Sequence, residues 1–303
     1  MHSCAPPART WPSAVISGVM WALLAVGIWS GWFVVTRYAV GGHGTLGAPD
    51  LVALRFGISG LLLVPVLLRR APSLPRRAWR DGLWFLVGSG APFALALSFG
   101  LRHAPASHAA ALTPGTMPLF AAGLGTLLLG ERPGRVRLLG FGLIAAGAAG
   151  IVASAGGGEW AGHAVFLACG LTWAAATVRL RQSGLAALDA TALTCVYSLA
   201  YVPLYLLSGV SRLGGAAWGE LAVQAIYQGV LASAVALLAF NRAVALIGAR
   251  APGFTALVPV LATLAGVFVL GEVPGLMDAA AVAAVAAGVL LTALGGTRVS
   301  RTE

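Results

Sequence analysis

The chain has 303 residues, of which 59% are hydrophobic and only 9% are charged, and its mean hydropathy is +0.89. A soluble domain must cover itself with polar residues, so this composition excludes an ordinary soluble protein. The formal net charge of +10 comes from arginines that stand in short gaps between apolar runs, which excludes the clustered basic face of a nucleic-acid-binding protein.

Apolar runs long enough to cross a bilayer follow one another along the sequence. A helix needs about 20 apolar residues to cross ~30 Å of hydrocarbon. Breaks at charges, Gly/Pro clusters and polar turns predict ten spans, near residues 15–37, 50–68, 82–101, 105–129, 134–154, 161–180, 189–208, 219–241, 248–270 and 275–295. The first run lacks a small-residue cleavage site, so we interpret it as a span and not as a signal peptide.

The arginines predict the orientation, because short cytoplasmic loops carry an excess of basic residues. With the N-terminus in the cytoplasm, fifteen arginines fall on the inner side and three, Arg37, Arg102 and Arg212, on the outer side. Arg55 stands at the start of the second span. We therefore expect both termini, residues 1–14 and 297–303, to face the cytoplasm.

A stretch of nineteen residues occurs twice in the sequence, with changes. The stretch TMPLFAAGLGTLLLGERPG at 116–134 returns as LVPVLATLAGVFVLGEVPG at 257–275, 141 residues later, with eight of nineteen positions identical. The same offset aligns Trp32 with Trp173. Such repetition predicts two structural units, residues 15–155 and 161–296. Each unit holds five spans, and since five is odd, the second must enter the membrane from the opposite side, as in alternating-access transporters.

These residues carry a resemblance to a known family. The two copies of P-[LV]-[FL]-A closing on LLGERPG or VLGEVPG, with WSGWFVV in the first span, resemble the EamA-type branch of the drug/metabolite transporter superfamily. The resemblance covers residues 15–296. It implies an all-α bundle of ten transmembrane helices, arranged as two inverted five-helix repeats around a central cavity, that moves small metabolites across the inner membrane. Aromatic amino acid exporters are the narrower expectation.

A substrate pocket of this kind needs aromatic walls, a few polar groups, and backbone groups freed at helix breaks. The breaks are predicted in ALTPGTMP of the fourth span and RAPGFTALVP of the ninth, since prolines remove backbone hydrogen bonds. The candidate substrate-binding residues are Trp32, Trp173, Ser89, Thr113, Thr116, Tyr227, Gln228, Ser233 and Thr255. Ordinary kinking, packing of serines and interfacial tryptophans are the alternative interpretations.

The charged residues narrow the substrate class. None of the nine acids falls in the central part of a predicted span, which disfavours permanent cations. Phosphorylated sugars would need basic residues deep in the cavity, so we expect a neutral or zwitterionic metabolite with apolar bulk. Glu131 and Glu272 each precede Pro and Gly at a span end, and we interpret them as caps of the following helix.

Other titratable residues suggest little chemistry. His103 and His108 flank a short outer connection and are interpreted as a solvated pair, although they could provide proton coupling. The three cysteines lack disulfide or metal-ligand spacing. We therefore expect no cofactor and no metal. A small molecule and the lipid bilayer are the expected partners, with no nucleic acid, while monomer or dimer stays open.

Four functions remain, in two classes. The first is a secondary transporter of amino acids or related metabolites, moving them down a gradient. The second is a broad-specificity exporter of drugs or metabolites coupled to protons. A membrane-embedded enzyme or a lipid-handling protein belongs to another class. The enzyme is disfavoured because no HExxH, GxSxG or paired intramembrane Asp occurs in the sequence.

Overall fold

The computed structural model describes residues 12–247, 253–295 and 297–298. Within them, ten helical segments are long and apolar enough to cross a bilayer, which confirms the predicted count. They are Ala14–His43, Ala48–Ser73, Arg76–His103, Ala106–Leu128, Arg135–Ala153, Glu159–Ser183, Ala187–Leu207, Trp218–Phe240, Gly253–Leu270 and Leu276–Leu294. The start of the predicted ninth span, at 248–252, and most of both predicted cytoplasmic ends lie outside the described residues.

The first five spans comprise α1 (Pro12–Tyr38) with the π-helix η1 (Ala39–His43), α2 (Ala48–Arg70) with η2 (Ala71–Ser73), α3 (Arg76–Ser89), α4 (Ala91–His103), α5 (Ala106–Leu112), α6 (Met117–Leu129) and α7 (Arg135–Ala153). The second five comprise α8 (Glu159–Ser183), α9 (Ala187–Ser198), α10 (Tyr201–Leu207), η3 (Leu213–Gly215), α11 (Trp218–Gln224), the π-helix η4 (Ala225–Val235), α12 (Ala236–Ile247), α13 (Leu257–Leu270) and α14 (Leu276–Leu294). Two-residue strands, β1 (Arg132–Pro133) and β2 (Thr297–Arg298), pair antiparallel at one end of the bundle.

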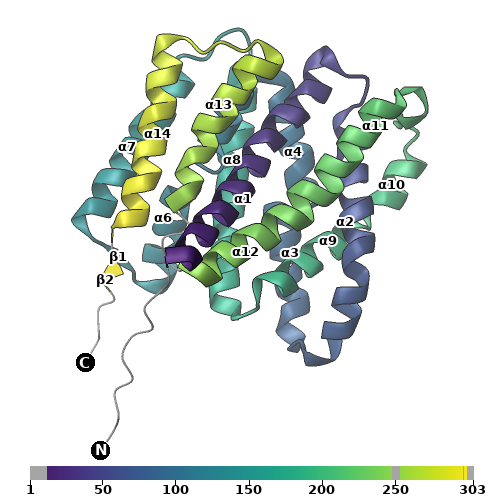
Figure 1. The fold of residues 1–303 in the computed structure, drawn as a ribbon, viewed down its shortest axis with the longest axis horizontal. Helices are drawn as coiled ribbons and strands as arrows, with labels where there is room; N and C mark the ends of the chain where they lie inside the picture. Colours follow the sequence, from purple (N-terminus) through teal and green to yellow (C-terminus); the bar gives the residue numbers. More distant parts are fainter. Residues whose placement is uncertain (1–11, 248–252, 296, 299–303) are drawn as a thin grey trace, which may run out of the picture.

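The two sides of the bundle are defined by the path of the chain (Figure 1). We call the terminal side the one at which α1 begins and the β1–β2 pair lies, and the far side the opposite one. Because α1 to α7 make five crossings, α1 runs from the terminal to the far side, whereas α8, the first helix of the second repeat, runs back. The repeats are therefore inverted.

Several spans are interrupted where the sequence removes backbone hydrogen bonds. The fourth span breaks at 113–116, as its two prolines and glycine predict, so that α5 ends before α6 begins. The third span breaks at Gly90, where Ser198 of the other repeat accepts a hydrogen bond from the Ala91 N–H at 3.0 Å. The described part of the ninth-span break, 253–256, is a single tight turn before α13.

The apolar surface is arranged as in a membrane protein. Large hydrophobic side chains face outward on many helices, for example Leu207, Trp218 and Phe268, each more than four-fifths exposed. The largest cluster of buried side chains joins α1, α4, α5, α7, α8, α13 and α14, so both repeats contribute to one core.

Glycines let α7 and α14, the fifth helix of each repeat, pack closely (Figure 1). A Cβ on Gly140 would lie 2.7 Å from the carbonyl oxygen of Gly288, and one on Gly288 would lie 2.6 Å from that of Gly140. Backbones at this distance leave no room for a side chain, which is how small residues join membrane helices.

Gly147→Leu is expected to destabilise this contact, because a Cβ there would meet the Ala281 carbonyl oxygen at 2.6 Å. Overpacking of this kind costs about 1–3 kcal/mol. Thermal unfolding of the detergent-solubilised protein should show a lower midpoint. Gly142→Leu, on the same helix but with nothing within 4 Å of its Cβ, is the matched control and should unfold like the wild type. Equal loss in both variants would contradict the close contact.

Candidate functional site

Two adjoining cavities occupy the centre of the bundle. The first has a volume of about 230 Å³ and the second about 220 Å³. Both are bordered by Trp29, Arg55, Ser89, Trp173 and Ala232, so they meet at a common wall formed by α1, α2, α3, α8 and η4. Residues from both repeats therefore enclose a shared space, as the inverted-repeat architecture requires.

Aromatic rings form much of the second cavity. Trp29 lies against Phe240, with ring centroids 5.3 Å apart, and Phe93 meets Trp173 edge to face at 6.2 Å. Trp32 also borders this cavity. Rings held against one another offer rigid apolar walls at little entropic cost. The space suits a planar or branched apolar group.

Arg55 places a positive charge on this wall. Its guanidinium carbon lies 4.4 Å from the centroid of the Trp32 ring, a cation–π contact. Its Nε and Nη1 atoms are buried and have no hydrogen-bond partner among the described residues. An arginine keeps its charge at any physiological pH, and buried donors without partners are costly. Arg55 is thus equipped to bind an anionic group.

This arginine corrects a premise of the sequence interpretation. The sequence places Arg55 at the start of the second span, and phosphorylated sugars were set aside because they would need basic residues deep in the cavity. The structure places Arg55 in the second turn of α2, and this turn lies beside both cavities. The premise that the cavity lacks basic residues is wrong, because Arg55 borders both cavities.

A hydrogen-bonded network holds Trp32 in place. The indole Nε1 donates to Oε1 of Gln228 at 2.6 Å, and the amide nitrogen of Gln228 donates to Thr36 and Gln224. Gln228 lies in the π-helix η4, whose wider turn lets Ser233 donate to the Gln228 carbonyl five residues earlier. Such π segments recur at functional sites. These hydrogen bonds fix the Trp32 indole, and its ring lies in cation–π contact with the Arg55 guanidinium.

The predicted site residues divide into those at the cavity and those behind it. Trp32, Trp173, Ser89, Thr113, Ser233 and Thr255 border one or both cavities. Thr116, Tyr227 and Gln228 do not border either one. Thr116 donates to the Leu112 carbonyl and Tyr227 to the Ile28 carbonyl, at 2.6 Å and 3.0 Å. These three support the fold around the site, whereas Arg55, Trp29, Phe93 and Phe240 are additional wall residues.

The first cavity extends from Arg55 toward the terminal side. It is bordered there by Leu180, close to the end of α8, and by Ala187, the first residue of α9. On the far side, Arg37 at the end of α1 donates from Nε to Oε1 of Glu272 at 2.6 Å, and each side chain is 19% exposed. The first cavity therefore reaches toward the terminal side, while on the far side a half-buried ion pair joins the end of α1 to the turn after α13.

The predicted helix-capping role of Glu131 and Glu272 is wrong. Neither α7 nor α14 has a side-chain cap. Instead, Glu272 pairs with Arg37 and accepts a hydrogen bond from the Ala106 N–H at 3.0 Å, at the start of α5 in the other repeat. Glu131 pairs with Arg181 at the end of α8. The cause is the preceding glycine: Gly130 and Gly271 adopt left-handed φ of 65° and 69°, which turns each carboxylate back toward the bundle.

The interpretation of His103 and His108 as a solvated pair is half wrong. His103 is exposed, but His108 is 3% exposed and its Nδ1 lies 2.9 Å from Nε2 of His163. His108 lies in the first turn of α5 and faces the start of α8, which the sequence places 51 residues or more away. Spacing along the chain carried no signal for this contact.

The comparisons with known proteins agree with this architecture. The sequence profile of the EamA-like transporter family matches residues 16–153 and again 160–294. An uncharacterized protein, PA1977, of Pseudomonas aeruginosa is 33% identical over 239 residues, which cover 74% of this chain and 77% of the relative. A solved structure titled "Crystal structure of protein" has a TM-score of 0.61 at 21% identity and covers 93% of this chain and 96% of its own. That likeness shows the fold. Two profile matches that together span nearly the whole chain show that it belongs to the EamA-like transporter family of membrane transporters.

Proposed function

We propose that this transporter moves small metabolites that combine a carboxylate with an aromatic or apolar body, with aromatic amino acids as the leading case. The observation that carries the proposal is Arg55, whose unpartnered guanidinium nitrogens lie in the described structure beside the aromatic wall of Trp29, Trp32 and Trp173. The family supplies the general activity, and the chemistry of this wall supplies the substrate class.

The site can recognise each part of such a molecule. A planar guanidinium binds a carboxylate through two parallel hydrogen bonds. The C-terminal end of α5, at Thr113, borders the second cavity, and the carbonyls at a helix C-terminus favour a positive group such as an ammonium. The aromatic rings accept the apolar body. A zwitterion with an aromatic side chain would satisfy all three.

The transport cycle follows from the inverted repeats. We propose alternating access, in which the far side opens when Arg37 and Glu272 separate and the terminal side closes in turn. The arginine distribution supports placing the terminal side in the cytoplasm and the protein in a bacterial inner membrane. No Asp or Glu among the described residues borders either cavity, so movement down the substrate gradient is favoured over proton coupling.

The test compares three indole compounds as ligands of the purified protein. Tryptophan and indole-3-propionate carry a carboxylate, whereas tryptamine does not. Because a ligand of the folded state raises its stability, a concentration 100-fold above Kd should add about 2.7 kcal/mol. We expect higher thermal midpoints with the two carboxylates and little change with tryptamine.

Uptake of labelled tryptophan into proteoliposomes then separates a transporter from a lipid-handling protein or a membrane enzyme. Liposomes without protein, and unlabelled tryptamine as competitor, are the controls. Stabilisation by tryptamine equal to that by tryptophan would contradict carboxylate recognition. A conversion product of tryptophan in the liposomes would contradict transport as the activity.

A further inference from the structure

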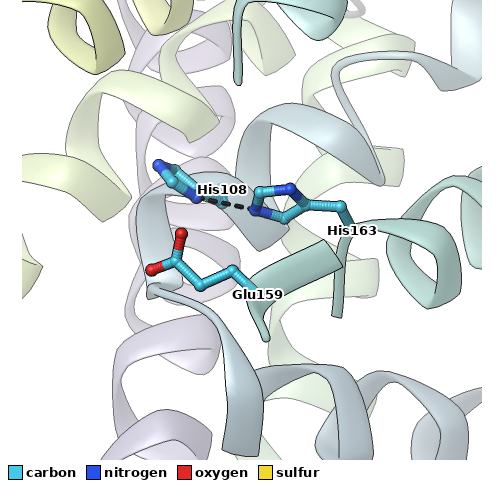
Figure 2. A group of neighbouring side chains, drawn as sticks. All are labelled: His108, Glu159 and His163. Carbon is cyan, nitrogen blue, oxygen red and sulfur yellow. Dashed lines mark hydrogen bonds between the residues drawn. The ribbon is translucent and has the colours of Figure 1, made fainter. Parts of the chain in front are cut away.

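A group of metal-ligating side chains lies on the far side, apart from the central cavities (Figure 2). His108 comes from α5, and Glu159 and His163 come from the first two turns of α8. The two rings and the carboxylate point toward one another in Figure 2. His108 belongs to the first repeat and the other two belong to the second, so the group bridges the repeats.

The geometry is close to that of a three-ligand metal centre. One ligand atom from each residue lies within 4.8 Å of the others, and the Nδ1 of His108 is 2.9 Å from the Nε2 of His163. Zinc binds imidazole nitrogen at about 2.0–2.1 Å, so two nitrogens of a tetrahedral site lie roughly 3.3 Å apart. A shift of a few tenths of an ångström at the rings would admit the ion.

The remaining nitrogen of His108 has the partner that metal-bound histidines use. Its Nε2 lies 3.6 Å from Oδ1 of Asp278, at the start of α14, and that carboxylate oxygen also accepts a hydrogen bond from Ser154. Histidine ligands commonly donate their second N–H to a carboxylate, which fixes the ring and raises its basicity. Asp278 would thus position His108 with Nδ1 toward the ion.

Burial and access both suit an ion. His108 and His163 are 3% and 1% exposed, so an ion between them is shielded from water. Glu159 is the first residue of α8 and only half-buried, which gives an entry path from the far side. Two imidazoles with one carboxylate suit zinc and its first-row neighbours and not magnesium or calcium, which prefer oxygen ligands.

We infer that His108, His163 and Glu159 form a binding site for a first-row transition metal ion such as Zn²⁺, with Asp278 as a positioning residue. An ion held there ties α5 of one repeat to α8 of the other, on the side where the Arg37–Glu272 pair lies. Zn²⁺ therefore stabilises the state in which the far side is shut and inhibits transport. The inhibition of transport by Zn²⁺ rests on the proposed function, whereas the binding of Zn²⁺ at this site does not.

The experiment titrates Zn²⁺ into the full chain, purified in detergent, with any affinity tag removed and with His2 and Cys4 replaced so that they bind no ion. Isothermal titration and elemental analysis after dialysis should give one ion per chain. His108→Ala and His163→Ala should each weaken binding by more than about 100-fold, and Asp278→Asn by about 10–100-fold. His103→Ala, an exposed histidine five residues from His108, is the matched control and should bind like the wild type.

Folding of each variant is checked by thermal unfolding in EDTA, with His163→Gln as the substitute should His163→Ala not fold. Added Zn²⁺ should raise the unfolding midpoint of the wild type and the His103 variant, and should not raise that of the His108 and His163 variants. Binding that is equal in the wild type and the His163 variants, or no ion retained by the wild type, would overturn the site.

The inhibition is measured separately. Zn²⁺ should slow uptake in wild-type proteoliposomes and leave uptake by the His163 variant unchanged. Zn²⁺ that binds without slowing uptake would overturn the stabilisation of the closed state alone. Absence of any uptake would count against the proposed function, whereas the binding result would stand.

Discussion

Arg55→Gln is expected to weaken carboxylate-bearing substrates by about 10–100-fold and to leave tryptamine unaffected. A hydrogen bond to a charged group contributes about 1.5–3 kcal/mol, and each 1.4 kcal/mol is a factor of ten in affinity. Arg55 has buried Nε and Nη1 atoms with no partner in the described part of the chain, so nothing replaces the bond that a substrate would make. Competition of unlabelled compounds against labelled tryptophan in proteoliposomes measures the change.

Two further variants separate charge from folding. Arg55→Lys keeps the charge but loses the planar two-bond geometry and the stacking on Trp32, so its affinity should fall between those of the wild type and Arg55→Gln. Arg76→Gln removes an exposed arginine from the start of α3 and should bind like the wild type. Equal affinity for tryptophan in Arg55→Gln and the wild type would refute the assigned role.

The architecture was predictable because it depends on patterns that lie along the chain. Ten apolar runs predict ten spans, and an offset of 141 residues predicts two inverted repeats. Both follow from local constraints: helices must satisfy their own backbone in lipid, and a duplicated gene leaves matched residues. The break at 113–116 was predictable for the same reason, since proline acts on its own helix.

The position of Arg55 in the cavity could not be predicted from the sequence. Its position eight residues into α2 placed it near a span end, and near an end an arginine can reach water. Only the tertiary packing of α1 and α2, each against α4 and η4, determines that its guanidinium lies over Trp32 and not in the interface. The available signal was its isolation: no acid stands three or four residues before or after it, where a helical ion pair would form, and unpaired charges inside spans favour a functional interpretation.

The polar pairs across the repeats could not be predicted at all. His108 meets His163, and Glu272 meets Arg37, across 55 and 235 residues of sequence. Such contacts depend on the tilt and rotation of helices in the bundle, which an individual span does not encode. Glu131 and Glu272 occupy matching positions of the two repeats, which indicates a shared role. The sequence pattern is the same for a helix cap and for an ion pair, so it does not distinguish the two roles.

Glu272→Gln is expected to open the far side. The Arg37–Glu272 pair is half-buried, while Arg181 of the Glu131 pair is 53% exposed, and attraction between charges is stronger where water is excluded. Glu272 also accepts from the Ala106 N–H, and Arg37 donates to the Leu101 carbonyl at 2.6 Å, so α1, α4 and α5 of one repeat are tied to the end of α13 in the other. Losing the pair should shift the equilibrium toward the far-side-open state by at least about tenfold.

Thiol labelling at Phe33 measures this shift. Phe33 borders the second cavity and is 3% exposed, so Phe33→Cys, with Cys4, Cys169 and Cys195 replaced, should react slowly with an impermeant reagent added from the far side. Adding Glu272→Gln should accelerate the reaction by at least about tenfold. Each hydrogen bond to a charged group that is lost contributes about 1.5–3 kcal/mol to the closed state, and 1.4 kcal/mol is a factor of ten. Glu131→Gln, the repeat-related control, should not accelerate it.

Exchange of the two charges distinguishes attraction from mere damage. Arg37→Glu combined with Glu272→Arg restores an ion pair with reversed polarity and should slow labelling again, although the bond from the Ala106 N–H is lost. Each single charge reversal places like charges together and should label at least as fast as Glu272→Gln. If the exchange variant labels as fast as the single reversals, the pair does not hold the far side shut. Alternating access would then require a different barrier on that side.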